Sequence, residues 1–171
     1  MKLTGFNRFL LTAGILYTLL FIIYEYVVKT QTNWDLQFIS GISVVADHVL
    51  QVLGYATFPM REDGYIHGVG IDGSHGVWVG SGCNALTLFG LFGVFVIAWP
   101  GALKHKFWFI PLGIVFIHLL NIVRIVALAI IAYRFPNYLD FNHTYTFTFV
   151  IYSFIFGLWM VWVKRFSEHH A

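Results

Sequence analysis

The sequence SGCNALTLFGLFGVFVIAW occupies residues 81–99 and decides how the rest of the chain is interpreted. It passes from small polar residues into an apolar run that contains no charged side chain. Cys83, the only cysteine of the chain, stands at this transition. Because an uncharged apolar run of this kind favours a lipid environment, the sequence predicts that Cys83 marks the mouth of a membrane-spanning helix.

The composition of the whole chain agrees with a membrane protein. Of its 171 residues, 58% are hydrophobic, 19% are aromatic and only 11% are charged, which is more apolar surface than a soluble domain of this size can bury. The formal net charge is only +2 and the basic residues are scattered, which argues against a nucleic acid partner. A single cysteine cannot form an intramolecular disulfide, so Cys83 is a free thiol, an intermolecular partner or a reactive group.

Four apolar segments predict an all-α integral membrane fold. We expect transmembrane helices at about residues 9–28, 84–99, 107–133 and 144–163, within a single membrane domain that covers residues 1–171. The second segment is short, since its residues rise about 24 Å against a hydrocarbon core of about 30 Å. The first could instead be a cleaved signal peptide, but no small-residue cleavage pattern follows it, so we take it as a retained helix.

The stretch 29–82 is expected to form an extracytoplasmic segment between the first two spans. Residues 36–58 carry apolar side chains at helical spacing, which is typical of an amphipathic helix on the membrane surface or across other helices. The apolar positions of this stretch are Phe38, Ile42, Val45, Val49, Val52 and Leu53. Residues 59–82 are rich in glycine, and short alternating pieces around Asp72-Gly73 predict a small β-hairpin that leads the chain to Cys83.

The distribution of basic residues predicts the orientation of the chain. With the N-terminus inside, six basic residues fall on the cytoplasmic side: Lys2, Arg8, Lys104, Lys106, Lys164 and Arg165. Three fall outside: Lys29, Arg61 and Arg134. Because cytoplasmic loops carry the excess of lysine and arginine, we expect both termini in the cytoplasm. Cys83 then lies on the outer face of the cytoplasmic membrane.

Arg124 stands inside the third apolar segment, where an arginine near the helix centre costs about 2.5 to 3.5 kcal/mol on insertion scales. Snorkelling to the interface is an alternative, because Arg124 lies about 26 Å along the segment from Phe107. Apolar residues continue for two further turns, however, which indicates that the guanidinium is enclosed by protein. His118, Asn121 and Arg124 recur every three residues and share one helical face, which we predict to turn inward.

His143 precedes the fourth apolar segment on the same predicted side as Cys83. The predicted topology removes three other histidines from the reach of the thiol: His105, His169 and His170. It leaves four competitors for the role of base: His48, His67, His75 and His118.

Cys83, Arg124 and His143 together predict a membrane-embedded cysteine enzyme. A thiol attacks a peptide carbonyl as the thiolate, and a histidine can accept its proton and later protonate the leaving amine. Arg124 would stabilise the thiolate or the developing oxyanion in a water-poor site. Asn121 could orient the arginine or donate to the oxyanion. This chemistry requires no metal and no other cofactor.

These motifs resemble those of the exosortase and archaeosortase family of prokaryotic membrane cysteine transpeptidases. That family has a cysteine beside small residues at the start of a membrane helix, an Asn-x-x-Arg in the next helix and a histidine at the start of another. The corresponding motifs here are Ser81-Gly82-Cys83-Asn84-Ala85, Asn121-Ile122-Val123-Arg124 and Asn142-His143, within residues 65–163. Asn84-Ala85 departs from the usual Ser-Gly, and the short chain suggests a compact bacterial form.

The resemblance implies a function as well as a site. Cys83, Arg124 and His143 would be catalytic, and Asn121, Ser81 and Asn84 would support the substrate or the oxyanion. The substrates would be exported proteins that end in a short motif, an apolar helix and a basic tail. The enzyme, surrounded by membrane lipids, would cleave this C-terminal sorting signal and transfer the acyl group to an extracellular acceptor such as a lipid or glycan.

Two other functions are compatible with the sequence. A metal-dependent membrane hydrolase would use residues of the glycine-rich segment, namely His67, Asp72 and His75, but no His-Glu-x-x-His or comparable spacing is present. A non-enzymatic scaffold or carrier would pair Arg124 with an acid such as Glu25 or Asp47 and leave Cys83 without a chemical role.

Overall fold

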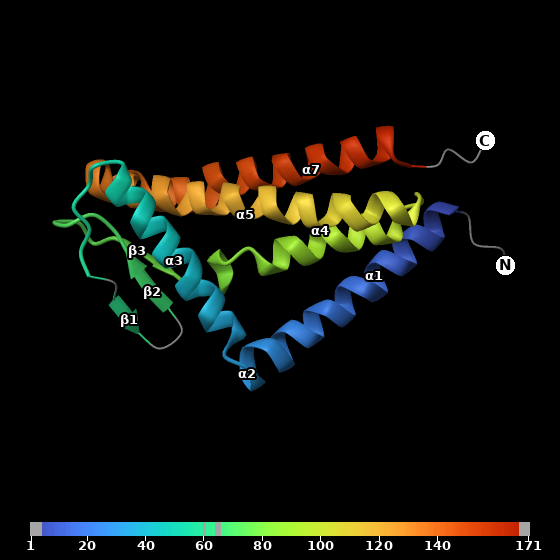
Figure 1. Cartoon of the computed structure of the whole chain (residues 1–171), viewed down its shortest axis with the longest axis horizontal. Helices are drawn as coiled ribbons and strands as arrows, with labels where there is room; N and C mark the ends of the chain where they lie inside the picture. The colour runs from blue at the N-terminus through green and yellow to red at the C-terminus, as the bar shows by residue number, and fades with distance from the viewer. Residues whose placement is uncertain (1–4, 60, 64–65, 168–171) are drawn as a thin grey trace.

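The computed structural model describes residues 5–59, 61–63 and 66–167, most of which are helical (Figure 1). Among these residues, three helical segments are long and apolar enough to cross a membrane: Gly5–Gln31, Leu103–Arg134 and Pro136–Arg165. They contain the first, third and fourth predicted spans. The protein is therefore a multi-pass membrane protein, with both ends of its chain at the same end of the molecule.

The first segment consists of α1 (Gly5–Ile23), the π-helical turn η1 (Tyr24–Val28) and α2 (Lys29–Gln31). No residue of α1 is buried. Its contact with α4 includes Phe9, whose ring centroid lies 5.4 Å from that of Phe95 and 4.8 Å from that of Trp99. From there α1 and α4 diverge toward α2, so that the two helices enclose a wedge (Figure 1).

Helix α4 (Leu86–Ala98) is the second predicted span, but it is shorter than expected. Its 13 residues rise about 20 Å, which is less than the hydrocarbon core, so the prediction of four full spans is confirmed for three. The helix begins two residues later than expected because Ala85 has left-handed backbone angles, with φ at 64°. Lys106 ends it by donating from Nζ to the carbonyl oxygens of Ile97 and Trp99, at 2.7 and 2.8 Å.

Helices α5 (Leu103–Arg134) and α7 (Phe147–Arg165) pack against α4. Their shared core is formed by fully or nearly buried side chains that include Phe92, Phe109 and Trp162. The connection between α5 and α7 is largely helical. It contains η3 (Pro136–Tyr138), α6 (Leu139–Phe141) and the π-helical turn η4 (Asn142–Thr146), which continues into α7.

Helix α3 (Trp34–Val52) confirms the helix expected within residues 36–58, but its buried face differs from the predicted one. The buried residues are Asp35, Ile39, Ile42, Ser43, Ala46 and Leu50, of which only Ile42 belongs to the predicted apolar set. The reason is that α3 packs against both α5 and the sheet. Small residues on the buried stripe let these neighbours approach closely, whereas the exposed Val45 and Val52 remain on the outside.

The predicted hairpin is present and belongs to a three-stranded antiparallel sheet. Its strands are β1 (Arg61–Asp63), β2 (Ile66–Val69) and β3 (Val77–Val79), in that order. In the hairpin, His67 pairs with Val79 and Val69 pairs with Val77. These three valines are buried in a core shared with α3 and α5, and β3 ends two residues before Ser81. The sheet therefore fixes the start of the segment that carries Cys83.

Candidate active site

Cys83 ends the 3-10 turn η2 (Ser81–Cys83), and its half-buried thiol faces His143. The distance between Cys83 Sγ and His143 Nε2 is 3.6 Å, within the range of a hydrogen bond to sulfur, although the two residues are 60 positions apart in the chain. His143 lies in η4, and π-helical turns of this kind occur frequently at functional sites. The structure thus brings the predicted nucleophile and the predicted base together.

Arg124 lies on α5 beside a cavity of about 170 Å³. The cavity is also lined by residues of the Cys83 segment, of α4 and of α7, among them Gly82, Thr87, Thr148 and Tyr152. Arg124 Nε is buried and has no hydrogen-bond partner within the described part of the chain. Since buried donors are normally paired, this unpaired N-H group marks Arg124 as a candidate functional residue. The guanidinium of Arg124 is also close enough to His143 for an electrostatic interaction with its imidazole.

Asn121 lies one turn before Arg124 on α5 and contacts the segment that carries Cys83. Its side chain is fully buried, and Nδ2 donates to the carbonyl oxygen of Cys83 at 2.8 Å. His118, on the same face of α5, packs instead against the rings of Phe38 and Phe89, with centroid distances of 5.5 and 6.3 Å. The prediction that this face of α5 turns inward is confirmed. The hydrogen bond from Asn121 fixes the backbone of Cys83.

Asp35 is a central residue of this region that the sequence reasoning missed. Its side chain is only 3% exposed and accepts hydrogen bonds from three others. Tyr24 Oη and Ser81 Oγ each donate at 2.8 Å, and Asn84 Nδ2 donates at 2.5 Å. Ser81 and Asn84 flank Cys83, so both expected supports point at Asp35 and hold the segment that carries the thiol. Aspartate in the first turn of a helix is common, so its sequence position is no signal of this role.

Asn84 also determines where α4 begins. Its Oδ1 accepts the backbone N-H of Leu86 at 3.0 Å, and the side chain is fully buried. At the start of a helix, unpaired N-H groups and the helix dipole stabilise a thiolate. Cys83 does not hold such a position, because α4 starts three residues after it and the N-H of Leu86 is already bonded to Asn84. The described contact of the sulfur is with His143.

Ala85 is the residue that takes the left-handed conformation between Asn84 and α4, and it is the only non-glycine residue with a positive φ in the described chain. An L-residue pays about 1 to 2 kcal/mol for this conformation, whereas glycine adopts it freely. We therefore expect Ala85→Gly to raise the free energy of unfolding by about 0.5 to 1 kcal/mol, after the larger entropy of glycine in the unfolded chain is subtracted. Thermal unfolding in detergent measures this, and Ala127→Gly inside α5 should have the opposite sign. A lower Tm for Ala85→Gly would contradict the assignment.

The part of the chain that the structure describes does not show the contacts expected of the two alternative functions. Among the residues that the structure describes, no group of three His, Cys, Asp or Glu side chains is placed to hold a metal ion. Glu25 pairs with Lys29 at 3.0 Å, and Asp47 accepts from Gln51 at 2.7 Å. Neither acid is paired with Arg124, as the scaffold would require.

The fold and the site define a class: a multi-pass helical membrane protein whose lone cysteine contacts a histidine, with an arginine in a cavity lined by the neighbours of the cysteine. Comparison with known families matches residues 3–163 to the family described as Transmembrane exosortase (Exosortase_EpsH). The chain belongs to the transmembrane exosortase family, as its motifs led us to expect, and this is a family of transmembrane transpeptidases. No curated protein and no solved structure matches the chain.

Proposed function

We propose that this protein is a membrane-embedded cysteine transpeptidase whose catalytic residues are Cys83, His143 and Arg124. The observation that carries the proposal is the contact of 3.6 Å between the thiol and the imidazole. Arg124 lines the adjoining cavity with a buried N-H that has no acceptor among the described residues. A nucleophile, a base and an oxyanion donor are the requirements of acyl transfer.

The reaction has two halves, and His143 moves a proton in each. In the first, the proton of the thiol passes to Nε2 while Sγ attacks the carbonyl carbon of the scissile peptide bond, and Arg124 stabilises the oxyanion. The tetrahedral intermediate collapses to a thioester as His143 protonates the leaving amine. In the second, His143 deprotonates the acceptor, which attacks the thioester and releases the thiol. Water as acceptor gives hydrolysis.

Asn121, Ser81 and Asn84 support this chemistry by holding the Cys83 segment. Asn121 fixes the carbonyl of Cys83, and the other two fix its neighbours through Asp35. A rigid backbone keeps the sulfur within reach of both the imidazole and the substrate carbonyl, since a displacement of about 1 Å can cost about 100-fold in rate. The support of the substrate or oxyanion expected from these residues is therefore indirect.

The substrates that follow from membership of this family are exported proteins with a C-terminal sorting signal. The signal combines a short motif, an apolar helix and a basic tail, and the enzyme cuts it outside the membrane. The acyl group passes to an extracellular acceptor such as a lipid or a glycan. A half-buried thiol beside a polar cavity at one end of the helices suits a peptide bond at the membrane boundary.

The base is tested by replacing His143 in cells that produce the enzyme together with a candidate substrate from the same genome. We expect His143→Ala to slow the appearance of the cleaved protein by about 10² to 10⁴-fold, because general acid-base catalysis contributes this much. His118→Ala is the matched control, since this histidine packs against rings and does not contact the sulfur. Full processing by the His143 variant would remove the imidazole from the mechanism.

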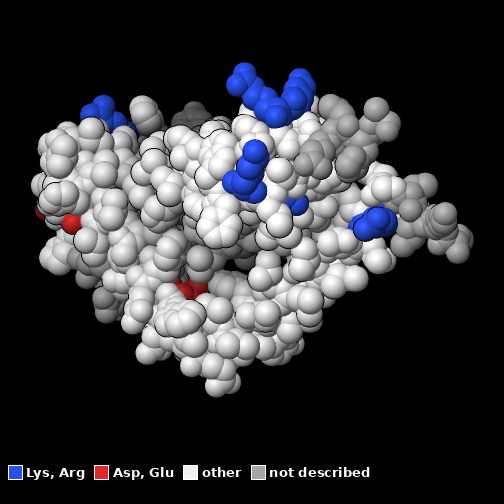
Figure 2. Space-filling model, turned by 45° about the vertical axis from the view of Figure 1, so that its right-hand side comes forward, with Lys and Arg blue, Asp and Glu red and all other residues white. Residues whose placement is uncertain are grey.

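The orientation proposed for the enzyme has both termini in the cytoplasm and Cys83 on the outer side of the cytoplasmic membrane. Five basic residues lie at the end of the helices that holds the termini: Arg8, Lys104, Lys106, Lys164 and Arg165. Figure 2 shows one face of the molecule, and most of the lysine and arginine side chains visible there lie over this part. Lys29 begins α2 and Arg134 ends α5, so both lie toward the opposite end of the first and third membrane segments. This asymmetry supports a cytoplasmic position for the termini.

A membrane-impermeant maleimide tests this orientation directly. Because Cys83 is the only cysteine, we expect intact spheroplasts to be labelled at this residue without any other substitution. Lys104→Cys in a Cys83→Ser background is the control, and it should react only after the membrane is opened. Labelling of Lys104→Cys from outside, with Cys83 protected, would invert the proposed topology.

A further inference from the structure

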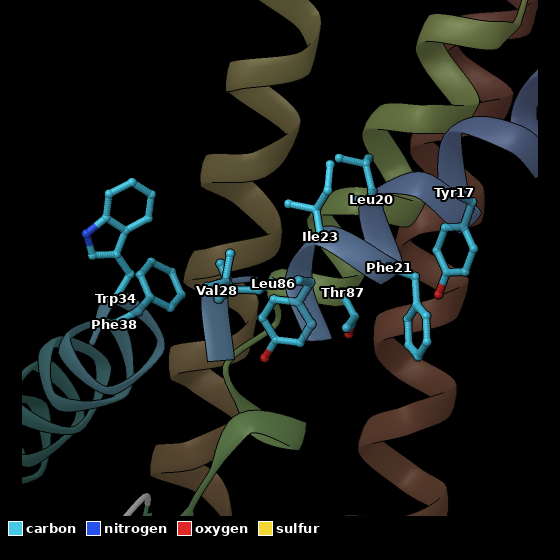
Figure 3. Close-up of a pocket in the computed structure, with 11 residues that line it drawn as sticks. Tyr17, Leu20, Phe21, Ile23, Val28, Trp34, Phe38, Leu86 and Thr87 are labelled. Carbon is cyan, nitrogen blue, oxygen red and sulfur yellow. The ribbon is translucent and has the colours of Figure 1, made fainter. Parts of the chain in front are cut away.

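An apolar groove of about 470 Å³ lies between the first membrane segment, α4 and α3 (Figure 3). Leu20, Phe21 and Ile23 of α1 form one wall. Leu86 and Thr87 of α4 form the second, and Trp34 and Phe38 of α3 extend it on the side of the sheet. The groove is separate from the cavity beside Arg124, which contains no residue of α1 or α3.

The groove exists because α1 contacts α4 along its first part and then diverges from it, so that residues 17–23 are exposed. Phe9 packs on α4 at one end, and the Tyr24 hydroxyl donates to Asp35 just beyond the other. No residue of α1 is buried between these points, although the helix runs beside an apolar neighbour. A helix pair held open in this way leaves room for another apolar element between its members.

One end of the groove lies next to the segment that carries Cys83. Thr87 lines both the groove and the cavity of Arg124, so the two spaces lie on either side of this residue. Leu86 and Thr87 follow Cys83 by three and four positions, and Tyr24 of the opposite wall is bonded to Asp35 and Asn84. A molecule lying in the groove therefore has one end beside the segment that carries the thiol.

We propose that this groove docks the apolar helix of the protein being cut, an inference that rests on the proposed peptide chemistry at Cys83. The chain that follows the scissile bond enters the bilayer next to the thiol, and within hydrocarbon it must be helical to satisfy its backbone. The groove follows residues 17–28, a length of about 17 Å or three helical turns. The substrate helix enters sideways between α1 and α4 and places its N-terminal end at the cavity of Arg124.

Gly90 is the feature of the groove that favours a helix as occupant. It lies on α4 one turn after Thr87, and a Cβ built on it would meet no other atom within 4 Å. Small residues at such positions let two helix backbones approach closely in a membrane. The same open space means that a larger side chain at Gly90 fills the groove without displacing a neighbour.

Disulfide crosslinking detects the docked helix without requiring catalysis. In a Cys83→Ser background, Leu20→Cys places one thiol in the groove and Gly157→Cys places one on the exposed face of α7. The probe is a reporter domain fused to the C-terminal apolar helix and basic tail of a protein from the same genome, with single cysteines placed along its helix. We expect crosslinks to Leu20→Cys that recur every three to four probe positions, and none to Gly157→Cys.

Filling the groove in the otherwise unchanged enzyme gives the second readout. We expect Gly90→Leu to reduce cleavage of the same probe at least ten-fold, whereas Gly90→Ala retains most of it. Gly157→Leu is the matched control, because this helical glycine also has open space around it, and it should cleave normally. Equal yield and Tm of Gly90→Leu, Gly90→Ala and Gly157→Leu exclude misfolding. Leu20→Trp is a second filled-groove variant, which fills the groove from the opposite wall.

The outcomes separate the docking site from the catalytic proposal. Absence of crosslinks at Leu20→Cys, or normal cleavage by both filled-groove variants, overturns the docking site even if processing still depends on Cys83. Crosslinks in the expected pattern together with processing that survives Cys83→Ala keep the docking site and overturn the catalytic proposal. Labelling of the groove by a photoactivatable phospholipid, with no crosslink to the probe helix, assigns the groove to lipid and also overturns the docking site.

Discussion

Replacing Cys83 with alanine is expected to abolish processing of a co-expressed substrate, with a loss of about 10⁴-fold or more, because no other group can form the acyl-enzyme. Cys83→Ser is expected to be inactive as well, since a hydroxyl is a far weaker nucleophile than a thiolate. Immunoblotting of the reporter before and after cleavage measures both. The protein should still insert and fold, because the side chain makes one hydrogen bond, to His143, and is only partly buried where it packs against the core.

A matched variant makes the Cys83 result interpretable. Ser81→Ala changes the residue two positions earlier and removes one of the three hydrogen bonds to Asp35. It should lower activity only moderately, because Asn121 and Asn84 still hold the segment. If the Cys83 variants continued to process the substrate, the cysteine mechanism would be wrong. Loss of activity on chelation in those same variants would favour metal chemistry.

Asp35→Ala is expected to have the largest effect on stability. It removes the acceptor of three side-chain hydrogen bonds and leaves the buried Asn84 amide with only the longer contact of 3.3 Å to the Tyr24 hydroxyl. Hydrogen bonds to a charged group contribute about 1.5 to 3 kcal/mol each, so we expect a loss of about 3 kcal/mol or more in the free energy of unfolding. Because Ser81 and Asn84 flank the thiol, processing should fall in the protein that remains folded.

Asp35→Asn tests whether the network needs both carboxylate oxygens or only a side chain of the same shape. The amide keeps one acceptor oxygen but turns a donor toward other donors, so stability should lie between those of the wild type and Asp35→Ala. Asp47→Ala, on the exposed side of α3, is the control and should cost less than 1 kcal/mol, because it loses one exposed hydrogen bond to Gln51. Wild-type Tm for Asp35→Ala would show that the carboxylate does not hold the cysteine segment.

The sequence was sufficient for the elements whose signal is local. The apolar run around Arg124 predicts a spanning helix because length and composition alone determine it, and the three-residue spacing of His118, Asn121 and Arg124 defines a face. The predicted topology reduced the eight histidines to five that could reach Cys83, and the position of His143 at the start of the last span distinguished it from the other four. These inferences needed only the order of segments along the chain.

The parts that were missed depend on contacts between distant segments. Asp35 acquires its partners only because η1, α3 and the Cys83 segment converge, and no spacing in the chain indicates this. The buried face of α3 was predicted from hydrophobicity, but the sheet and α5 select small residues such as Ser43 and Ala46 instead. Likewise, the late start of α4 reflects the hydrogen bond of Asn84 and the left-handed Ala85.

The most direct test of the Cys83, His143 and Arg124 site is to detect the covalent intermediate by mass spectrometry. Enzyme incubated with its substrate and without acceptor is quenched in acid, digested and analysed for the peptide that contains Cys83. We predict a thioester between this cysteine and the new C-terminus of the substrate, which hydroxylamine releases and which His143→Ala greatly reduces. A cleaved substrate accompanied by an unmodified Cys83 peptide, or by an adduct on another residue, would contradict the account.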